Sequence, residues 1–202
     1  KWYESSISSG TSQDGMTQQA IQMSRVLRDQ ILIDGYKAYT NQRSNEWIRT
    51  IEGCGLSAGL IGGIGGSKCR SAGAHAIHNG LTQIEKANKF LHGEIVGFGI
   101  LIQLRLEEKV LKNQLARQAR IQLQNLLKSI NIPLTISDLG LQNTSKEELL
   151  SACNFACRHD FGMENLPFPV EPDLLLSTIL ETSDIRNRQE IYSNNIVLGE
   201  KN

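Results

Sequence analysis

The sequence predicts an all-α fold, a single bundle of helices that spans residues 1–202. Apolar residues recur at helical spacing along most of the chain, and residues that start or stop helices separate these runs. No segment alternates between apolar and polar residues over a useful strand length, apart from a short stretch at Ile196–Leu198. A chain of this length can bury a sizeable core within one domain.

The first part of the chain is predicted to begin irregularly and then to form a long helix. Residues 1–12 are rich in Ser and Gly, which favours an irregular lead-in. Apolar residues then follow helical spacing from Met16 to Ile31. The dipeptide Asp34-Gly35 either ends this helix or interrupts it, because glycine weakens a helix interior.

A second helix is expected over residues 46–60, followed by a glycine-rich connection. Its inner face is predicted to carry three bulky side chains, Trp47, Ile48 and Ile51. Half of the 18 glycines lie between Gly53 and Gly80. The stretch Gly62–Lys68 suggests a phosphate-binding loop, but it reads Gly-Ser-Lys instead of Gly-Lys-Ser/Thr, and no buried strand precedes it. A tight connection that lets the next helix pack closely is the better interpretation.

Two further helices are predicted around the histidines. Arg70–Thr82 is expected to form the first and His92–Val110 the second. The second is apolar nearly all round over its first half, which is typical of a helix at the centre of a domain. Gly97 and Gly99 lie in this apolar stretch and indicate the close approach of another backbone.

The last third of the chain is predicted to contain three more helices. Gln114–Ile130 has the apolar spacing of an amphipathic surface helix. The segment Thr144–Glu147 matches a capping box and predicts that a helix begins there. Pro172 stands where a first helical turn accepts proline, which predicts a helix over residues 173–189.

The composition excludes some partners and suggests a compartment. Lys plus Arg and Asp plus Glu both number 21, so the chain has no electrostatic footprint for nucleic acid or an anionic membrane surface. The densest apolar run, Ile95–Leu104, is far too short to span a membrane. Cys153 and Cys157 are one helical turn apart, which disfavours a disulfide, and nothing nearby completes a metal site. Buried, reduced thiols are the better interpretation and suit a cytoplasmic location.

The candidate functional residues are histidines. His75 and His92 are predicted to lie on two successive helices, and a corner between helices can hold two neutral imidazoles for a divalent metal. A buried, hydrogen-bonded histidine is the commoner alternative for each. His78 lies one turn from His75 on roughly the same helix face, so it is either an outer residue of the metal site or part of a helix contact.

The two histidine segments resemble a known family. Gly73–Thr82, with the order His-Ala-Ile-His-Asn-Gly, and His92–Leu104, which begins His-Gly-Glu, resemble the metal-site half of the iron-containing alcohol dehydrogenase family, and its glycerol dehydrogenase branch in particular. The resemblance extends more weakly over residues 2–180. In that family the histidines that correspond to His75 and His92 bind zinc or iron, together with an aspartate from further upstream. The resemblance therefore implies metal ligation by both histidines.

The resemblance also implies the place of this chain in a larger enzyme. Lys1–Glu4 resembles the helix that follows the aspartate ligand, so the aspartate and the nucleotide-binding domain that holds most of NAD(P) are expected upstream. The expected activity is that of an alcohol or polyol dehydrogenase, in which the metal polarises the substrate hydroxyl for hydride transfer to NAD. The chain is then a carboxyl-terminal half that is inactive alone, and the full-length enzyme is expected to be a homo-oligomer.

Other interpretations stay open from the sequence. Glycerol-1-phosphate dehydrogenase and dehydroquinate synthase are related enzymes that keep a metal and NAD for different substrates. A non-catalytic helical module is the alternative of another class. In such a module His75 and His92 complete the core or hold a structural metal.

Overall fold

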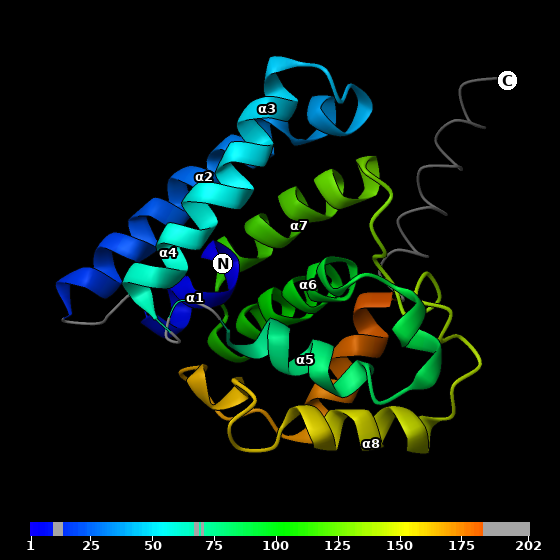
Figure 1. The fold of residues 1–202 in the computed structure, drawn as a ribbon. Coiled ribbons are helices and arrows are strands. Elements are labelled where there is room, and N and C mark those ends of the chain that lie inside the picture. The colour runs from blue at the N-terminus through cyan, green and yellow to red at the C-terminus, as the bar shows by residue number, and fades with distance from the viewer. Residues whose placement is uncertain (10–13, 67–68, 70, 184–202) are drawn as a thin grey trace, which may run out of the picture.

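The computed structural model describes residues 1–9, 14–66, 69 and 71–183. Throughout these residues the regular structure is helical and no strand occurs, so the predicted all-α fold is confirmed (Figure 1). None of the helices in this part of the chain is long and apolar enough to cross a membrane.

The elements follow one another along the chain as α-helices with a few short π and 3₁₀ segments. They are α1 (Trp2–Ser9), α2 (Gly15–Thr40), α3 (Asn45–Glu52), the π segment η1 (Gly53–Ser57), α4 (Ala58–Gly65), α5 (Gly73–Leu81), the 3₁₀ segment η3 (Glu85–Lys89), α6 (His92–Leu111), α7 (Gln114–Ser129), α8 (Lys146–Ala156), the 3₁₀ segment η4 (Met163–Asn165) and a helix at residues 172–183.

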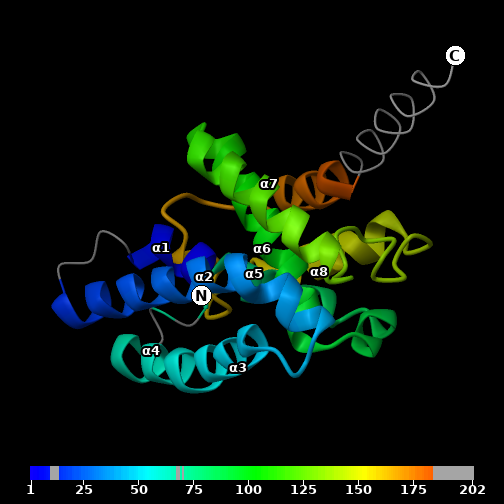
Figure 2. The same cartoon turned by 90° about the horizontal axis from the view of Figure 1, so that it is seen from above.

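The helices form two groups that are linked through α1 and α7. One group consists of α2 packed against α3 and α4, and the other contains α5 packed against α6 and α8 (Figures 1 and 2). Both α1 and α7 contact α2 as well as α6. The largest hydrophobic core lies in the second group, where Phe98, Ile102 and Leu175 are fully buried.

The expected irregular lead-in at residues 1–12 is wrong for most of its length, because Trp2–Ser9 is helical. Tyr3 is 8% exposed, and Glu4 and Ser5 are each 1% exposed. A helix of eight residues is too short to be stable by itself. Its contacts with α2 and α6 stabilise it instead, and these contacts are not visible in the local sequence.

Helix α2 runs without a break through Asp34 and Gly35, so neither residue ends it. The carboxylate of Asp34 accepts two hydrogen bonds from the Arg49 guanidinium on α3, each 2.9 Å long. A Cβ at Gly35 would lie 3.4 Å from the side chain of Leu126 on α7. Tertiary contacts on both sides therefore outweigh the low helix propensity of glycine.

The second predicted helix is longer than expected, since η1 and α4 continue it to Gly65. Its expected inner face is wrong in part: Ile48 and Ile51 are 47% and 48% exposed. The face toward α2 is instead polar and small. Arg49 pairs with α2, and a Cβ at Gly53 would lie only 2.6 Å from Leu27 of that helix. Glycine at position 53 lets this segment approach α2 closely. The predicted glycine-rich connection begins helical, because α4 continues to Gly65.

Helices α5 and α6 lie close to their predicted places. A Cβ at Gly99 would lie 2.6 Å from the carbonyl oxygen of Ala74 on α5, so the predicted approach of another backbone is confirmed there. At Gly97 the nearest group is the side chain of Ile132, 3.3 Å away, so the prediction of a backbone neighbour is wrong for that residue. The contact at Gly99 sets the two histidine-bearing helices against each other.

The later helices also follow the prediction. α7 ends one residue before Ile130. The hydroxyl of Ser145 caps α8 by accepting a hydrogen bond from the Glu148 amide, one residue later than the predicted capping box places it. Residues 172–183 are helical, as expected after Pro172. The predicted continuation to residue 189 and the short strand at 196–198 lie outside the described residues.

Candidate metal centre

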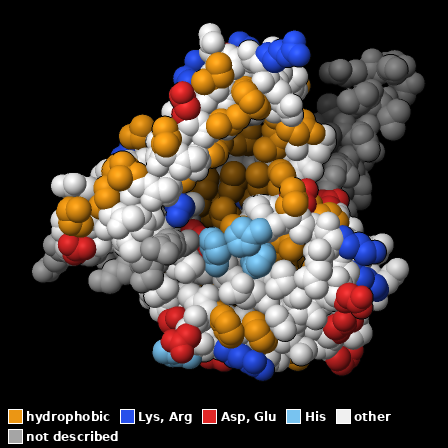
Figure 3. Space-filling model, in the orientation of Figure 1, with side chains coloured by type: hydrophobic (Ala, Val, Ile, Leu, Met, Phe, Trp, Pro, Cys, Tyr) orange, Lys and Arg blue, Asp and Glu red, His pale blue; other side chains and the backbone are white. Residues whose placement is uncertain are grey.

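The structure brings His75 and His92 together beside a hollow in the molecular surface. Figure 3 shows histidine side chains gathered at the edge of an apolar hollow, and His92 lines it. His75 lies in the first turn of α5, and His92 is the first residue of α6. Their ring centroids are 5.3 Å apart. Two imidazoles that bind one tetrahedral metal at about 2.1 Å have centroids about 5 Å apart, so the observed spacing is compatible with a shared ion.

The ring of His75 is held by the carboxylate of Glu4 from α1. The two carboxylate oxygens lie 2.8 and 2.7 Å from Nδ1 of His75. An ionised carboxylate can only accept a hydrogen bond, so Nδ1 carries the proton. The lone pair of His75 is therefore on Nε2, the nitrogen that remains for a metal. Carboxylate–histidine–metal arrangements of this kind fix the ring of a ligand and raise its basicity.

The ring of His92 is held in a similar way by His78. Nδ1 of His92 lies 3.0 Å from Nε2 of His78, and Nδ1 of His78 lies 3.1 Å from the side-chain oxygen of Asn79. Since Asn79 offers an acceptor, His78 donates from Nδ1 and accepts from His92 at Nε2. This tautomer leaves Nε2 of His92 with a lone pair. His78 therefore contacts the ring of His92, and an outer role for His78 in a metal site stays a prediction.

The local electrostatics favour a neutral His92 and a charged Glu4. Burial lowers the pKa of His92, the neighbouring His78 and His75 lower it further, and Glu4 opposes them. Burial alone would raise the pKa of Glu4. The hydrogen bonds from His75 and from the amides of Ala72 and His75 outweigh burial, so the pKa of Glu4 is lowered. A neutral imidazole beside an ionised carboxylate is the state that a metal site needs.

Comparison with known proteins gives a consistent result. No protein-family model matches the chain. An uncharacterised oxidoreductase from Synechocystis is 46% identical over 182 residues, which are 90% of this chain and 47% of that protein. Glycerol dehydrogenase from Citrobacter freundii is 29% identical over 84% of this chain and 45% of its own length. The chain is a homologue of the glycerol dehydrogenases. The resemblance predicted from the sequence is therefore confirmed.

The glycerol dehydrogenases also share its fold. The crystal structure of glycerol dehydrogenase from Schizosaccharomyces pombe superposes with a TM-score of 0.80 and covers 96% of this chain and 49% of that one, at 23% sequence identity. At this identity the likeness shows the fold alone. The chain spans about half the length of the curated relatives it matches.

The donor set of this glycerol dehydrogenase homologue fits part of a metal site. Nε2 of His75 and Nε2 of His92 are its two available imidazole nitrogens. Among the described residues, no group of three or more His, Cys, Asp or Glu side chains is arranged to hold a metal ion. His78 does not add a third donor, because both of its nitrogens are already hydrogen-bonded. A catalytic zinc site typically has three protein ligands, and His75 and His92 are the two candidates for such ligands among the described residues.

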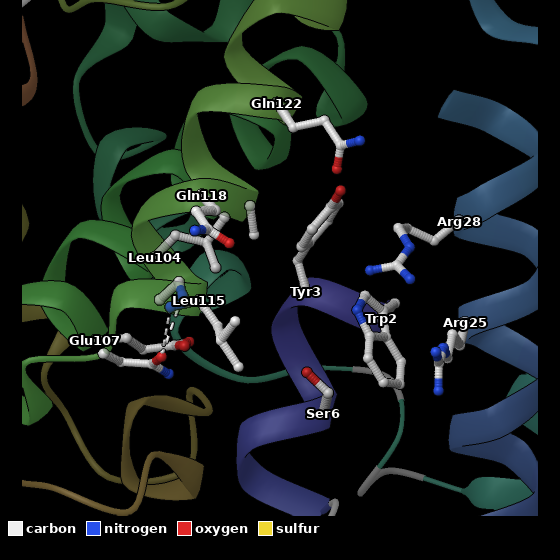
Figure 4. Close-up of a pocket in the computed structure, with 13 residues that line it drawn as sticks. Trp2, Tyr3, Ser6, Arg25, Arg28, Leu104, Glu107, Leu115, Gln118 and Gln122 are labelled. Atoms are coloured by element: carbon white, nitrogen blue, oxygen red, sulfur yellow. Dashed lines mark hydrogen bonds between the residues drawn. The ribbon is translucent and has the colours of Figure 1, made fainter. Parts of the chain in front are cut away.

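The hollow beside His92 has a volume of about 740 Å³ and is mainly apolar. Its apolar side chains include Leu27 and Ile31 from α2, Leu123 and Leu126 from α7, and Trp2 from α1. A second cavity of about 710 Å³ lies where α1, α2 and α7 meet, with Trp2, Tyr3, Arg25 and Arg28 along its wall (Figure 4). None of the three candidate histidines lines this second cavity, so the candidate metal centre belongs to the first.

Glu4 is the site residue that the sequence did not single out. The resemblance covered Lys1–Glu4 but located only a helix there. Nothing local indicates that an acidic residue next to a run of serines is buried, since acidic residues are rarely buried without a partner. Its partner, His75, is 71 positions away in the sequence.

Proposed function

We propose that this chain is the metal-binding helical part of an alcohol or polyol dehydrogenase that uses NAD(P). His75 and His92 are its metal ligands, and His78 and Glu4 orient them. One observation carries the proposal: two imidazoles from different helices lie 5.3 Å apart, and each has Nδ1 occupied and Nε2 available. The homology to glycerol dehydrogenases supports the choice of reaction class.

A divalent metal, zinc or iron, would supply Lewis acidity that polarises the substrate hydroxyl and lowers its pKa. The residues of this chain prepare the site for that chemistry. Glu4 keeps the proton of His75 on Nδ1, and His78 does the same for His92. The apolar wall of the hollow beside His92 offers a surface against which the carbon atoms of a substrate could pack. In the proposed enzyme NAD(P) is held mainly by residues outside this chain.

The substrate class in this proposal is a small alcohol or polyol, in keeping with the glycerol dehydrogenase relatives. We also assign the protein to the cytoplasm. No disulfide joins the four cysteines, all of which lie among the described residues, and a reducing compartment keeps such thiols reduced.

The test is a calorimetric Zn²⁺ titration of the protein that the complete gene encodes, with His75→Ala and His92→Ala as variants. Each variant loses one of two imidazoles, so each should bind Zn²⁺ at least tenfold more weakly and lose alcohol-dependent NAD(P) reduction. His159→Ala is the matched control, because His159 is an exposed histidine whose ring nitrogen Nδ1 lies 2.8 Å from Asp160 and which is not a candidate metal ligand. Variants that bind Zn²⁺ as tightly as the parent would support the non-catalytic helical module instead.

A further inference from the structure

The helix that carries His75 has no cap of its own. Ala72 precedes α5 and provides no side-chain hydrogen bond to the first turn. The first amides of a helix have no partner within it, so other groups must satisfy them. Here Oε1 of Glu4 accepts from the amides of Ala72 and His75, at 2.7 and 2.9 Å. Oε1 of Gln103, from α6, accepts from the amide of Ala74 at 3.0 Å.

The same Gln103 side chain also holds α1. Its Nε2 lies 3.2 Å from the carbonyl oxygen of Tyr3 and 3.1 Å from that of Glu4. A third acceptor, Oε1 of Glu107, lies 3.1 Å away. Gln103 is completely buried. One amide therefore joins α6 to α1 beside Glu4 and to α5 beside His75.

Only one orientation of the Gln103 amide satisfies these partners. The amide of Ala74 needs an acceptor, whereas the carbonyls of Tyr3 and Glu4 need a donor. A flipped amide would set donor against donor and acceptor against acceptor. A Cβ at Gly73 would lie 3.1 Å from the Gln103 oxygen, so glycine at that position leaves room for the amide.

We infer that Gln103 is a positioning residue for the metal ligand His75. It holds α1 in register with the first turn of α5, so that the Glu4 carboxylate meets Nδ1 of His75. This inference rests on the proposed function, because it takes His75 as a ligand. Ligand side chains must be held within about 0.5 Å of their productive geometry, and hydrogen bonds from surrounding residues provide that restraint.

The packing of α5 on α6 does not depend on Gln103 alone. Gly99 of α6 lies against the backbone of Ala74, and residues such as Ile77 and Phe98 bury the rest of the contact. Loss of the Gln103 amide should therefore leave the two helices packed while it releases α1 and the first turn of α5. We expect the loss to change the orientation of the His75 ring.

The experiment uses the protein that the complete gene encodes, with Gln103→Met and Gln103→Leu as variants. Both keep an apolar stem and remove the amide, and either one that folds suffices. The Zn²⁺ affinity of the folded variant should fall by about 10-fold to 100-fold, the range for residues that orient a metal ligand. Amide hydrogen exchange at Ala74 and His75 should also become faster, because the Gln103 side chain no longer links the first turn of α5 to α1.

Leu175→Ala is the matched control, since Leu175 is completely buried on the helix at residues 172–183. It should lower the unfolding temperature and leave the Zn²⁺ affinity unchanged. Parental affinity in the Gln103 variants, while His75→Ala loses Zn²⁺, would overturn the inference and leave the proposed function standing. An equal loss of affinity in Leu175→Ala would also overturn it, because the loss would then follow stability. Parental affinity in His75→Ala would refute the proposed function, and the role of Gln103 with it.

Discussion

Glu107 should make the stability of this protein depend on pH. This carboxyl group borders the second cavity (Figure 4) but is only 4% exposed. Burial raises its pKa from 4.5 to about 7, although the hydrogen bond from Gln103 opposes the change. Because the pKa of Glu107 is higher in the folded state, its protonated carboxyl contributes its full stability below pH 4.5. This contribution is lost as the pH rises through 7. At about 1.36 kcal/mol per pKa unit, the difference amounts to about 3 kcal/mol.

The assay is urea unfolding of the parent and of Glu107→Gln at pH 5 and pH 8. Glutamine keeps an oxygen that can accept from Gln103 and cannot ionise. The variant should gain about 2.5 kcal/mol of stability relative to the parent between the two pH values, because only the parent must bury a charge at pH 8. A stability difference that is the same at both pH values would refute the reasoning.

The neighbouring Glu108 provides a control of opposite sign. Burial favours a higher pKa there, but the hydrogen bonds from Arg105 and Arg120 outweigh it, so the pKa is lowered. Such a group contributes stability above its unfolded pKa and loses it as the pH falls. Glu108→Gln should therefore be less stable than the parent at pH 8. The difference should become smaller in acid.

Two further results are expected. In Gly99→Ala the new methyl group would lie 2.6 Å from the carbonyl oxygen of Ala74, so α5 must move away from α6. Urea unfolding should show a loss of about 1–3 kcal/mol of stability. A variant as stable as the parent would show that the two helices can move apart without cost. The 202-residue chain alone should not reduce NAD with glycerol, because hydride transfer needs cofactor and alcohol held together; turnover by this chain would contradict the proposed division of the site.

The sequence alone determined the elements whose signals are local. The apolar period of residues 114–130 and the capping residues near Ser145 located α7 and α8 to within a residue or two. The apolar first half of α6 predicted its central place, and Gly99 predicted the backbone contact with α5. Helical spacing and caps act within a few residues, so the sequence shows them directly.

Only the tertiary structure decided how the histidines are held. Glu4 on α1 contacts His75 on α5, which is 71 positions away in the sequence. Gln103 on α6 forms hydrogen bonds to both of these helices. Tertiary packing also makes α1 helical, because its buried residues contact other helices. It leaves Ile48 exposed to solvent, because Arg49 and Gly53 face α2 instead. Periodicity tells which residues share a helix face, whereas the partner of that face depends on how distant helices pack.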